Sequence, residues 1–308
     1  MKRLFLSILI LLLTLSTLCQ RVLVFPFDQK SGDIKSLWLE TGLSASIEES
    51  LIYNSILTVP TEHLENYFKE QKLISRPKFP LSSQIGLARK FGASHLIRGE
   101  YKIENETIKI NYSIFDLTTI IKKQQEGTIE GSVHKLSELT EEIARQFVNG
   151  MNIQFKPYPQ ISNDGFESYI RGRSATDPIL KEVYFRKALD IEPEYYDAKC
   201  LLAIVLKEEN EISESVKILE ELKTKSYSKS SLGLRTLGEI KMELGKFGEA
   251  KELFLLSLKD SENAEGHILL AKLYLKQGKK EDALNEIKIA ETFGTHKREI
   301  EEILKELK

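Results

Sequence analysis

The residues that could carry chemistry are few and lie far apart. The five histidines are His63, His95, His134, His267 and His296, and none belongs to an HExxH motif or another paired metal-ligand spacing. Histidines scattered in this way are typical of surface or structural positions. We therefore predict no metal site and no catalytic histidine.

Phosphate-loop chemistry is suggested only superficially, by Gly238 and the pair Gly245-Lys246. Six residues separate the two glycines, which is more than the Walker spacing allows, and no strand-like run precedes them. The sequence contains no GxSxG or CxxC motif, and no cysteine with a plausible catalytic base is visible. We predict no catalytic residues, no cofactor and no enzymatic activity.

Asp28 follows a short apolar run over residues 22–27 that we expect to be a buried strand. Functional groups of α/β domains often lie at the carboxyl ends of strands. Turn capping is the commoner role of such an aspartate and is the favoured interpretation. A pocket beyond the strands at Val22 and Ile56, lined by polar groups such as Asp28, would favour the functional role.

The overall composition is that of a globular protein. The chain of 308 residues has 41% hydrophobic and 29% charged residues, with a formal net charge of −2, and is long enough for two domains. Proteins that bind nucleic acids usually show a basic excess or a basic patch with interleaved aromatic residues. Neither stands out here, so we expect no nucleic-acid partner.

The N-terminal residues 1–19 have the pattern of a signal peptide. Lys2 and Arg3 precede a run over residues 4–18 that is almost entirely apolar or hydroxylated. This run is shorter than the roughly 20 residues of a membrane-spanning helix. We predict an exported protein in the periplasm or at the outer membrane, with an uncleaved membrane anchor as the alternative.

Cys19 raises the question of lipidation. Leu18 and Ser16 stand where a bacterial lipobox has a small residue and a leucine, so the pattern is atypical. Lipidation of Cys19 and simple cleavage near it stay open as alternatives. Either one leaves Cys200 as the lone free thiol, which excludes a disulfide within the mature chain.

Residues 20–152 alternate between strand-like and helix-like patterns, which predicts an α/β (α+β) domain of order β-α-β-α-α-β-β-β-α. The last three strands are joined by turns too short for crossover helices, so they should form an antiparallel meander. The expected strands are 22–27, 56–59, 94–104, 107–117 and 120–129, and the expected helices are 39–51, 61–70, 82–91 and one that carries Leu139, Ile143 and Phe147 inward.

Four segments of this domain carry a family resemblance. They are Val24-Phe25-Pro26-Phe27-Asp28, Thr41-Gly42-Leu43, residues 88–101 and residues 110–117. At these residues the stretch resembles the N-terminal domain of TolB and its relatives. The resemblance implies an architecture rather than a reaction, and a role in envelope assembly or in regulating cell-wall enzymes.

A Pro- and Gly-containing stretch, residues 153–165, predicts a linker. Residues 166–308 follow it with helical periodicity, in a pattern that recurs about every 34 residues. Asn210, Gly245 and Gly278 should occupy the turn between two helices in each unit. The aligned small and large positions are Leu202-Ala203, Leu237-Gly238 and Leu270-Ala271, then Ser215, Ala250 and Ala283, then Leu219, Phe254 and Ile287.

This spacing resembles the tetratricopeptide pattern, in which small side chains let two antiparallel helices approach and a large one plugs their crossing. We therefore expect an all-α solenoid over residues 166–308. It should begin with an incomplete unit and end in a cap helix over residues 297–308, whose Glu- and Lys-rich face would be solvated.

The resemblance implies that the first helix of each unit lines a concave groove. Apolar anchors there would give affinity for an extended or helical peptide, and charges would set its register. Cys200 and Ile204 stand where carboxylate-clamp repeats have lysine and asparagine, so we do not expect recognition of a C-terminal carboxylate. The nominated groove residues are Cys200, Ile204, Lys207, Leu232, Arg235, Glu239, Met242, Ile268, Lys272 and Leu275.

Cys200 has two interpretations. We predict a reduced, partly accessible thiol that faces the groove, and the alternative is a small apolar filler between helices. Labelling by a thiol reagent without denaturant would favour the groove.

The leading hypothesis is a non-enzymatic exported scaffold or adaptor of the bacterial cell envelope, which binds a protein or peptide through the groove. Its membrane contact would come only from the N-terminal segment or a lipid on Cys19. The alternative is a ligand-sensing or enzyme-regulating module centred on the α/β domain.

Overall fold

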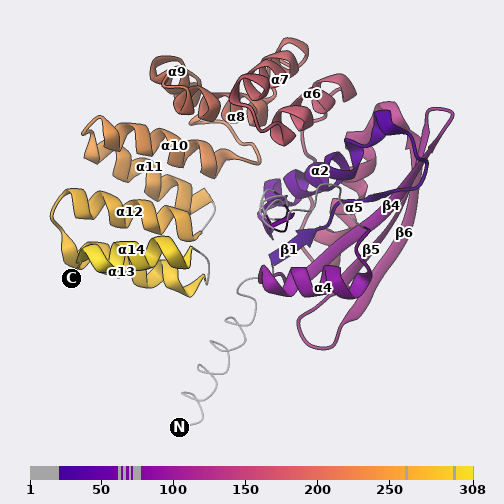
Figure 1. The fold of residues 1–308 in the computed structure, drawn as a ribbon, viewed down its shortest axis with the longest axis horizontal. Coiled ribbons are helices and arrows are strands. Elements are labelled where there is room, and N and C mark those ends of the chain that lie inside the picture. Colours follow the sequence, from indigo (N-terminus) through magenta and orange to yellow (C-terminus); the bar gives the residue numbers. More distant parts are fainter. Residues whose placement is uncertain are drawn as a thin grey trace, which may run out of the picture. The chain divides into compact units, whose positions relative to one another are not determined.

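The computed structural model describes residues 21–61, 64, 67–68, 71, 78–260, 263–293 and 296–307 (Figure 1). The predicted signal peptide, Cys19 with its possible lipid, and His63 lie outside the described residues. The chain divides into two compact units between Ile170 and Arg171. We call the part up to Ile170 unit 1 and the part from Arg171 onward unit 2.

Unit 1 is built on a mixed sheet, whose described strands are β1 (Arg21–Val24), β2 (Asp28–Gln29), β3 (Leu57–Thr58), β4 (His95–Glu104), β5 (Thr107–Asp116) and β6 (Lys122–Ser132). The strand order is β3-β1-β4-β5-β6, and β2 pairs with β4. Strand β1 runs parallel to β3 and β4, and β2 runs parallel to β4.

The antiparallel meander expected at the end of the domain is present, because β4 pairs with β5 and β5 with β6 in antiparallel register. Asn105 and Glu106 form the turn between β4 and β5, with φ of 49° and 61°. Positive φ at both residues of a two-residue loop matches the twist of the flanking strands. The apolar residues that alternate along β5 are all buried, so one face of this strand is wet and the other is core.

The first predicted strand, residues 22–27, is shorter than expected and is followed by the separate strand β2. Pro26 has no amide hydrogen to donate to a sheet ladder. The next amide, that of Phe27, donates to the carbonyl of Glu40 (3.0 Å) rather than to a strand. The chain returns to the sheet only at Asp28. The predicted helix over residues 61–70 lies only partly within the described residues.

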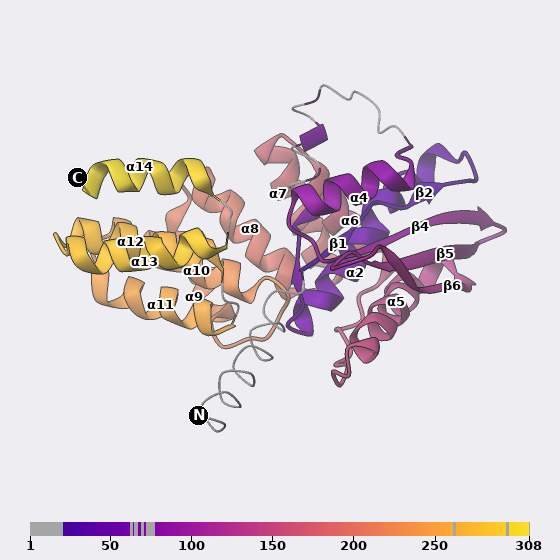
Figure 2. The same cartoon turned by 90° about the horizontal axis from the view of Figure 1, so that it is seen from below.

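Helices cover both faces of the sheet (Figure 2). Helices α2 (Leu39–Tyr53) and α5 (Leu136–Gly150) pack on one face, around a core that includes Val22. Helix α4 (Leu81–Lys90) packs on the other face, around a core that includes Leu23. Neighbouring residues of β1 enter different cores because successive side chains of a strand point to opposite faces.

Residues 153–165, predicted as a linker, belong to unit 1, and part of this segment contacts the end of α2. Asn54 at the end of α2 donates to the carbonyl of Lys156 (3.0 Å) and accepts from its amide (2.7 Å). The rings of Tyr53 and Tyr158 meet edge to face, with centroids 5.4 Å apart. These contacts hold the segment along α2 with specific partners.

Helix α6 (Asn163–Ser174) contains the division between the two units. On the unit 1 side, Phe166 packs edge to face on Trp38, with ring centroids 6.1 Å apart, and the Tyr169 hydroxyl donates to Glu49. Trp38 itself is partly buried at the start of α2. The first part of α6 therefore belongs to the core of unit 1.

Unit 2 contains the expected antiparallel helix pairs. Helices α8, α10 and α12 begin 34 residues apart, at Tyr196, Ser230 and Ala264. No helix within the described ranges is both long and apolar enough to cross a membrane. The helices are α7 (Pro178–Ile191), α8 (Tyr196–Glu208), α9 (Ile212–Leu222), α10 (Ser230–Glu243), α11 (Phe247–Asp260), α12 (Ala264–Lys276), α13 (Lys280–Thr292) and α14 (Lys297–Leu307).

The turns inside the pairs share one geometry. Asn210, Gly245 and Gly278 have φ of 67°, 74° and 73°, and the next amide bonds back across the helix end. After α10, for example, Lys246 N–H donates to the carbonyl of Lys241 (2.8 Å). This is the Schellman termination that a left-handed residue permits, and it reverses the chain within two residues.

The predicted small and large positions meet inside each pair. Phe254 of α11 is fully buried against Gly238 of α10, where an added Cβ would lie 2.5 Å from the ring. In the preceding pair, the Ser215 hydroxyl donates to the carbonyl of Ala203 (2.6 Å). The helix register and turns of unit 2 are therefore tetratricopeptide-like.

Candidate functional site

The first helices of the repeats, α8, α10 and α12, lie next to one another, and α14 contacts α12 (Figure 1). The ten nominated residues are on α8, α10 and α12, but they do not all reach the surface. Cys200, Met242 and Ile268 are buried. The partly exposed residues are Ile204, Lys207, Leu232, Arg235, Glu239, Lys272 and Leu275.

The prediction that Cys200 is partly accessible is wrong. The side chain is fully buried with Leu222 and Tyr227, and its Sγ lies 3.7 Å from the carbonyl of Lys229. Gly233 on α10 has no side chain, and a Cβ there would stand 3.3 Å from the sulfur. α10 can therefore approach α8 closely enough to cover the thiol. Burial raises the pKa of Cys200 to about 12, so the residue is a core filler.

Met242 and Ile268 are also excluded from the candidate binding surface. Met242 is 8% and Ile268 2% exposed, and both belong to the core shared by α10 to α14. Because each first helix packs against the next, residues on its flank are covered by a neighbouring helix. Only positions that point away from both neighbours can meet a partner.

Ion pairs connect successive first helices across the nominated face. The ammonium of Lys207 on α8 lies 2.7 Å from a carboxylate oxygen of Glu239 on α10. The ammonium of Lys272 on α12 lies 2.6 Å from a carboxylate oxygen of Glu299 on α14. Much of the charge expected to meet a partner is therefore already neutralised within the protein.

Arg235 lies between these pairs, in a cluster that sequence reasoning missed. Its guanidinium donates to the Ser231 hydroxyl (2.9 Å), and burial lowers its pKa despite the attraction of Glu265 and Glu239. The Nε2 of His296, just before α14, lies 3.2 Å from a carboxylate oxygen of Glu265 on α12. The cluster thus joins α10, α12 and the start of α14.

The two ionisable partners in this cluster stabilise each other's charge. The hydrogen bond to Glu265 raises the pKa of His296 against the opposing effect of burial. Burial opposes ionisation of Glu265, but the His296 hydrogen bond, its own amide and the nearby Arg235 bring its pKa to about 2. The sequence could have pointed to Glu265, because this residue lies 33 residues after the nominated Leu232 and so holds the equivalent position in the next repeat.

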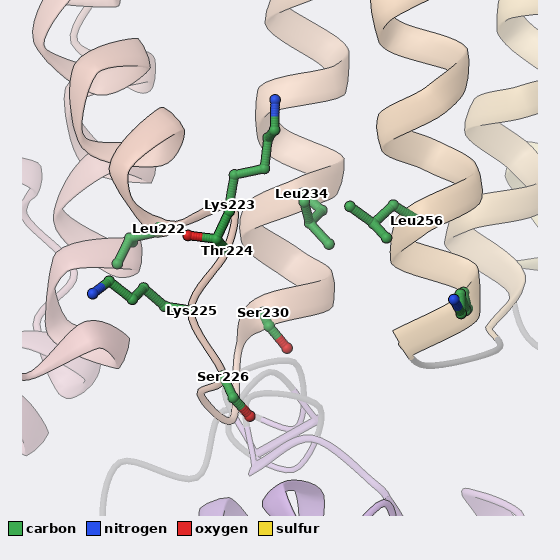
Figure 3. A pocket seen from close by; sticks show the side chains of 9 residues that line it. Leu222, Lys223, Thr224, Lys225, Ser226, Ser230, Leu234 and Leu256 are labelled. Atoms are coloured by element: carbon green, nitrogen blue, oxygen red, sulfur yellow. The ribbon is translucent and has the colours of Figure 1, made fainter.

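A separate hollow of about 310 Å³ lies between the end of α9, α10 and the end of α11 (Figure 3). Figure 3 shows Leu234 and Leu256 facing each other, whereas Lys223 and Lys225 extend in different directions. Lys225 lies over the Tyr196 ring, 5.4 Å from its centroid. The lysines follow helix ends, where they complement the helix dipole, and they do not form a convergent anion site.

The residues of β2, which follow the carboxyl end of β1, have partners within the fold. Asp28 is paired within β2 and lies 4.0 Å from the Arg98 guanidinium, so it is a strand residue rather than the turn cap that we expected. Gln29 donates to the Ser36 hydroxyl (2.7 Å), and the Tyr101 hydroxyl donates to the Ser36 carbonyl (2.7 Å).

His267 and His134 have a structural and a surface position, respectively. His267 is buried and lies 2.7 Å from Glu286 on α13, and His134 is exposed. Among the residues that the structure describes, no group of three His, Cys, Asp or Glu side chains could hold a metal ion.

The sequence matches no family model and no curated protein. Among solved structures, PilF of Pseudomonas aeruginosa is similar, at 18% identity and a TM-score of 0.41, over 53% of this chain and 70% of that one. A tetratricopeptide repeat protein from Parabacteroides merdae is similar at 22% identity and a TM-score of 0.41, over 56% of this chain and 63% of its own length. Lipoprotein GNA1162 of Neisseria meningitidis is similar at 17% identity and a TM-score of 0.32, over 43% of this chain and 99% of that one. The repeat assignment of unit 2 rests on its own helix spacing and turns.

Proposed function

We propose that this protein is a non-enzymatic, exported scaffold or adaptor of the bacterial cell envelope. It binds a protein or peptide partner along the first helices of its repeats. The observation that carries this proposal is the face formed by α8, α10 and α12, where Ile204, Leu232 and Leu275 stay partly exposed beside fixed ion pairs.

Apolar anchors should dominate the affinity at this face. The charges of Lys207 and Lys272 are already satisfied by Glu239 and Glu299, so a partner's charges would compete with existing pairs. Burying a leucine side chain is favourable by roughly 1.5–3 kcal/mol. A partner that inserts apolar side chains beside the ion pairs therefore gains more than one that replaces them.

The N-terminal pattern supports export. Residues 1–19 have the charge and apolar run of a signal peptide. Mass spectrometry of the chain purified from cell envelopes would test this. Cleavage before Cys19 with an added lipid mass, cleavage near Cys19 without it, and an intact N-terminus separate the lipoprotein, the exported protein and the anchored protein.

A pull-down from envelope extract tests the binding face. We compare the wild-type chain with a Leu232→Glu, Leu275→Glu double variant, which places two charges where apolar anchors are expected. The matched control is Ile179→Glu, Leu180→Glu on α7, where the two side chains are 64% and 50% exposed.

The proposal expects at least one partner that both the wild type and the α7 control recover and the groove variant loses. Thermal unfolding of all three chains verifies that they remain folded. Equal recovery of every partner by the groove variant would overturn the proposed binding face.

A further inference from the structure

Unit 1 has a hollow of about 660 Å³ at the amino-terminal ends of β3 and β4, opposite the carboxyl ends where the alternative hypothesis would place a pocket. The start of β6 and the C-terminal end of α5 complete its wall. The volume is that of a small-molecule site. Its lining residues are Leu57, His95, Ile114, Asp116, Thr118, Gln124, Gln125, Gln146, Phe147, Gly150, Met151 and Ile153.

The lining residues include one carboxylate and no lysine or arginine, and the cation nearest in the sheet is Lys122, the cross-strand partner of Asp116 on β6. Asp116 ends β5 opposite His95. Hydrogen bonds from the side chain and amide of Thr118 lower the pKa of Asp116, so it is ionised. Both of these bonds go to Oδ1 (2.6 and 2.8 Å). Within the described residues no donor contacts Oδ2, which leaves this oxygen as an acceptor.

His95 adds a neutral acceptor. Burial lowers the pKa of this imidazole despite the attraction of Asp116. The Ser94 hydroxyl donates to the carbonyl of Arg21 (3.2 Å) and lies 3.0 Å from His95 Nδ1. Where Nδ1 carries the proton, it donates to the Ser94 hydroxyl and leaves Nε2 as an acceptor.

The glutamines supply a third acceptor. Gln146 Oε1 accepts from the Tyr112 hydroxyl and from Gln125 Nε2, while Gln146 Nε2 donates to Glu142 (3.1 Å). This network fixes the Gln125 amide through its nitrogen. In the described part of the chain, nothing donates to Gln125 Oε1. Acceptor groups therefore outnumber donors in this wall.

We propose that this hollow binds a small organic cation, an ammonium or guanidinium group on an apolar body. Its N–H groups would be accepted by Asp116, His95 and Gln125. Its apolar part would lie against Ile114 and Phe147, both of which are buried side chains. A free amine and a lysine or arginine side chain of a partner share this chemistry.

Charge-matched probes of one shape test the proposal on the full chain. Benzylammonium, benzyl alcohol and benzoate have similar size and carry positive, zero and negative charge. With ¹³C-methyl methionine, the Met151 methyl reports on the hollow, and the Met242 methyl in unit 2 is the internal control. Benzylammonium should shift Met151 alone and bind at least about tenfold more tightly than the other two, because its hydrogen bonds are charge-assisted.

Two variants with opposite expected effects on benzylammonium affinity ensure that the test does not depend on one substitution. Asp116→Asn should weaken benzylammonium binding about tenfold, whereas Gln124→Glu, which adds a carboxylate at the exposed rim, should strengthen it about threefold. Asp28→Asn, far from the hollow in β2, is the matched control and should change nothing. Equal binding of all three probes, no shift of Met151, or unchanged affinity in both variants would overturn the proposal.

Adding Nα-acetyl-lysine methylamide distinguishes the two sources of the cation. Tighter binding than benzylammonium assigns the hollow to a protein side chain, and weaker binding assigns it to a free amine. The probes and variants all address unit 1, and Met242 of α10 serves only as a control that should not shift, so the result is independent of the function proposed for the repeats.

Discussion

The two units assemble their candidate sites in different ways. In unit 2, α8, α10 and α12 present equivalent positions to one face, and each contacts mainly its neighbours in the stack. In unit 1, the hollow draws on His95, Asp116, Gln125 and Phe147 from three strands and a helix. Each repeat places equivalent residues on the same face, so the surface of unit 2 follows from local spacing. The hollow of unit 1 instead requires strands that are distant in the sequence to pair.

This difference has consequences for stability and for access. A stack of repeats can open between neighbouring units without unfolding elsewhere. A mixed sheet with long-range pairings unfolds more nearly as one unit. The three measurements below test this contrast.

The largest expected effect concerns the labelling of Cys200 by a thiol reagent. Because the thiol is fully buried, with a pKa raised to about 12, labelling requires α8 and α10 to separate. We expect a rate at least about a thousandfold below that of a free cysteine peptide at the same pH. The measurement uses a Cys19→Ala chain in increasing urea, while fluorescence of Trp38, the only tryptophan, reports on unit 1.

The contrast between units predicts that labelling accelerates at a lower urea concentration than the Trp38 transition. Rapid labelling in native buffer would show that Cys200 is not core. Coincident urea transitions would show that the two units unfold together.

The second effect compares two glycines under close contact. An alanine at Gly99 in β4 would overlap the Phe27 ring and approach the carbonyl of Asn111 to 2.5 Å. At Gly238 the clash is with the Phe254 ring alone. The backbone carbonyl of Asn111 cannot move aside as easily as the Phe254 ring. We therefore expect Gly99→Ala to lower the free energy of unfolding by about 3 kcal/mol and Gly238→Ala by about 1–2 kcal/mol. Urea unfolding measures both.

Gly248→Ala on α11 is the matched control, because a Cβ there meets nothing within 4 Å. It should stabilise unit 2 by about 0.5–1 kcal/mol through helix propensity. A Gly238→Ala chain as stable as this control would contradict the close packing of α10 against α11.

The smallest effect is the pH dependence carried by His296. Glu265 raises the pKa of His296. The folding stability that this pair contributes is therefore fully present below the ordinary histidine pKa of about 6.5 and is lost as pH rises through the folded-state pKa. His296→Gln should therefore destabilise unit 2 by about 1 kcal/mol or less at pH 5.5 and by a smaller amount at pH 9. Urea unfolding at the two pH values measures the difference.

His134→Gln in unit 1 provides the comparison, because His134 is exposed and 4.0 Å from its nearest carboxylate. We expect no change at either pH. A His296→Gln effect that is equal at pH 5.5 and pH 9 would mean that the His296–Glu265 pair contributes no charge-dependent stability.

Sequence reasoning succeeded where a pattern repeats or alternates. The turns at Asn210, Gly245 and Gly278 and the buried face of β5 were predicted because each depends on local spacing. It failed at Cys200, since a glycine far along the chain, Gly233, decides whether the thiol is covered.

The hollow of unit 1 was missed for a similar reason. The alternative hypothesis directed attention to Asp28 near the carboxyl end of β1, where Gln29 and Tyr101 bond to Ser36. The hollow at the other end depends on the pairing of His95 with Asp116. That pairing follows from the two-residue turn, but the hollow also needs Gln125 of β6 and Phe147 of α5, and no short sequence pattern encodes their approach to these strand ends.

The ion pairs between first helices also bear on how the repeat array can change during evolution. Glu239 and Lys272 hold equivalent positions, 33 residues apart, as Leu237 and Leu270 do. Recombination that removed the middle repeat would bring Lys207 to face Lys272 instead of Glu239, and would exchange a 2.7 Å attraction for a repulsion. The charges thus give each copy a fixed place in the series, so that repeats of similar shape are not interchangeable.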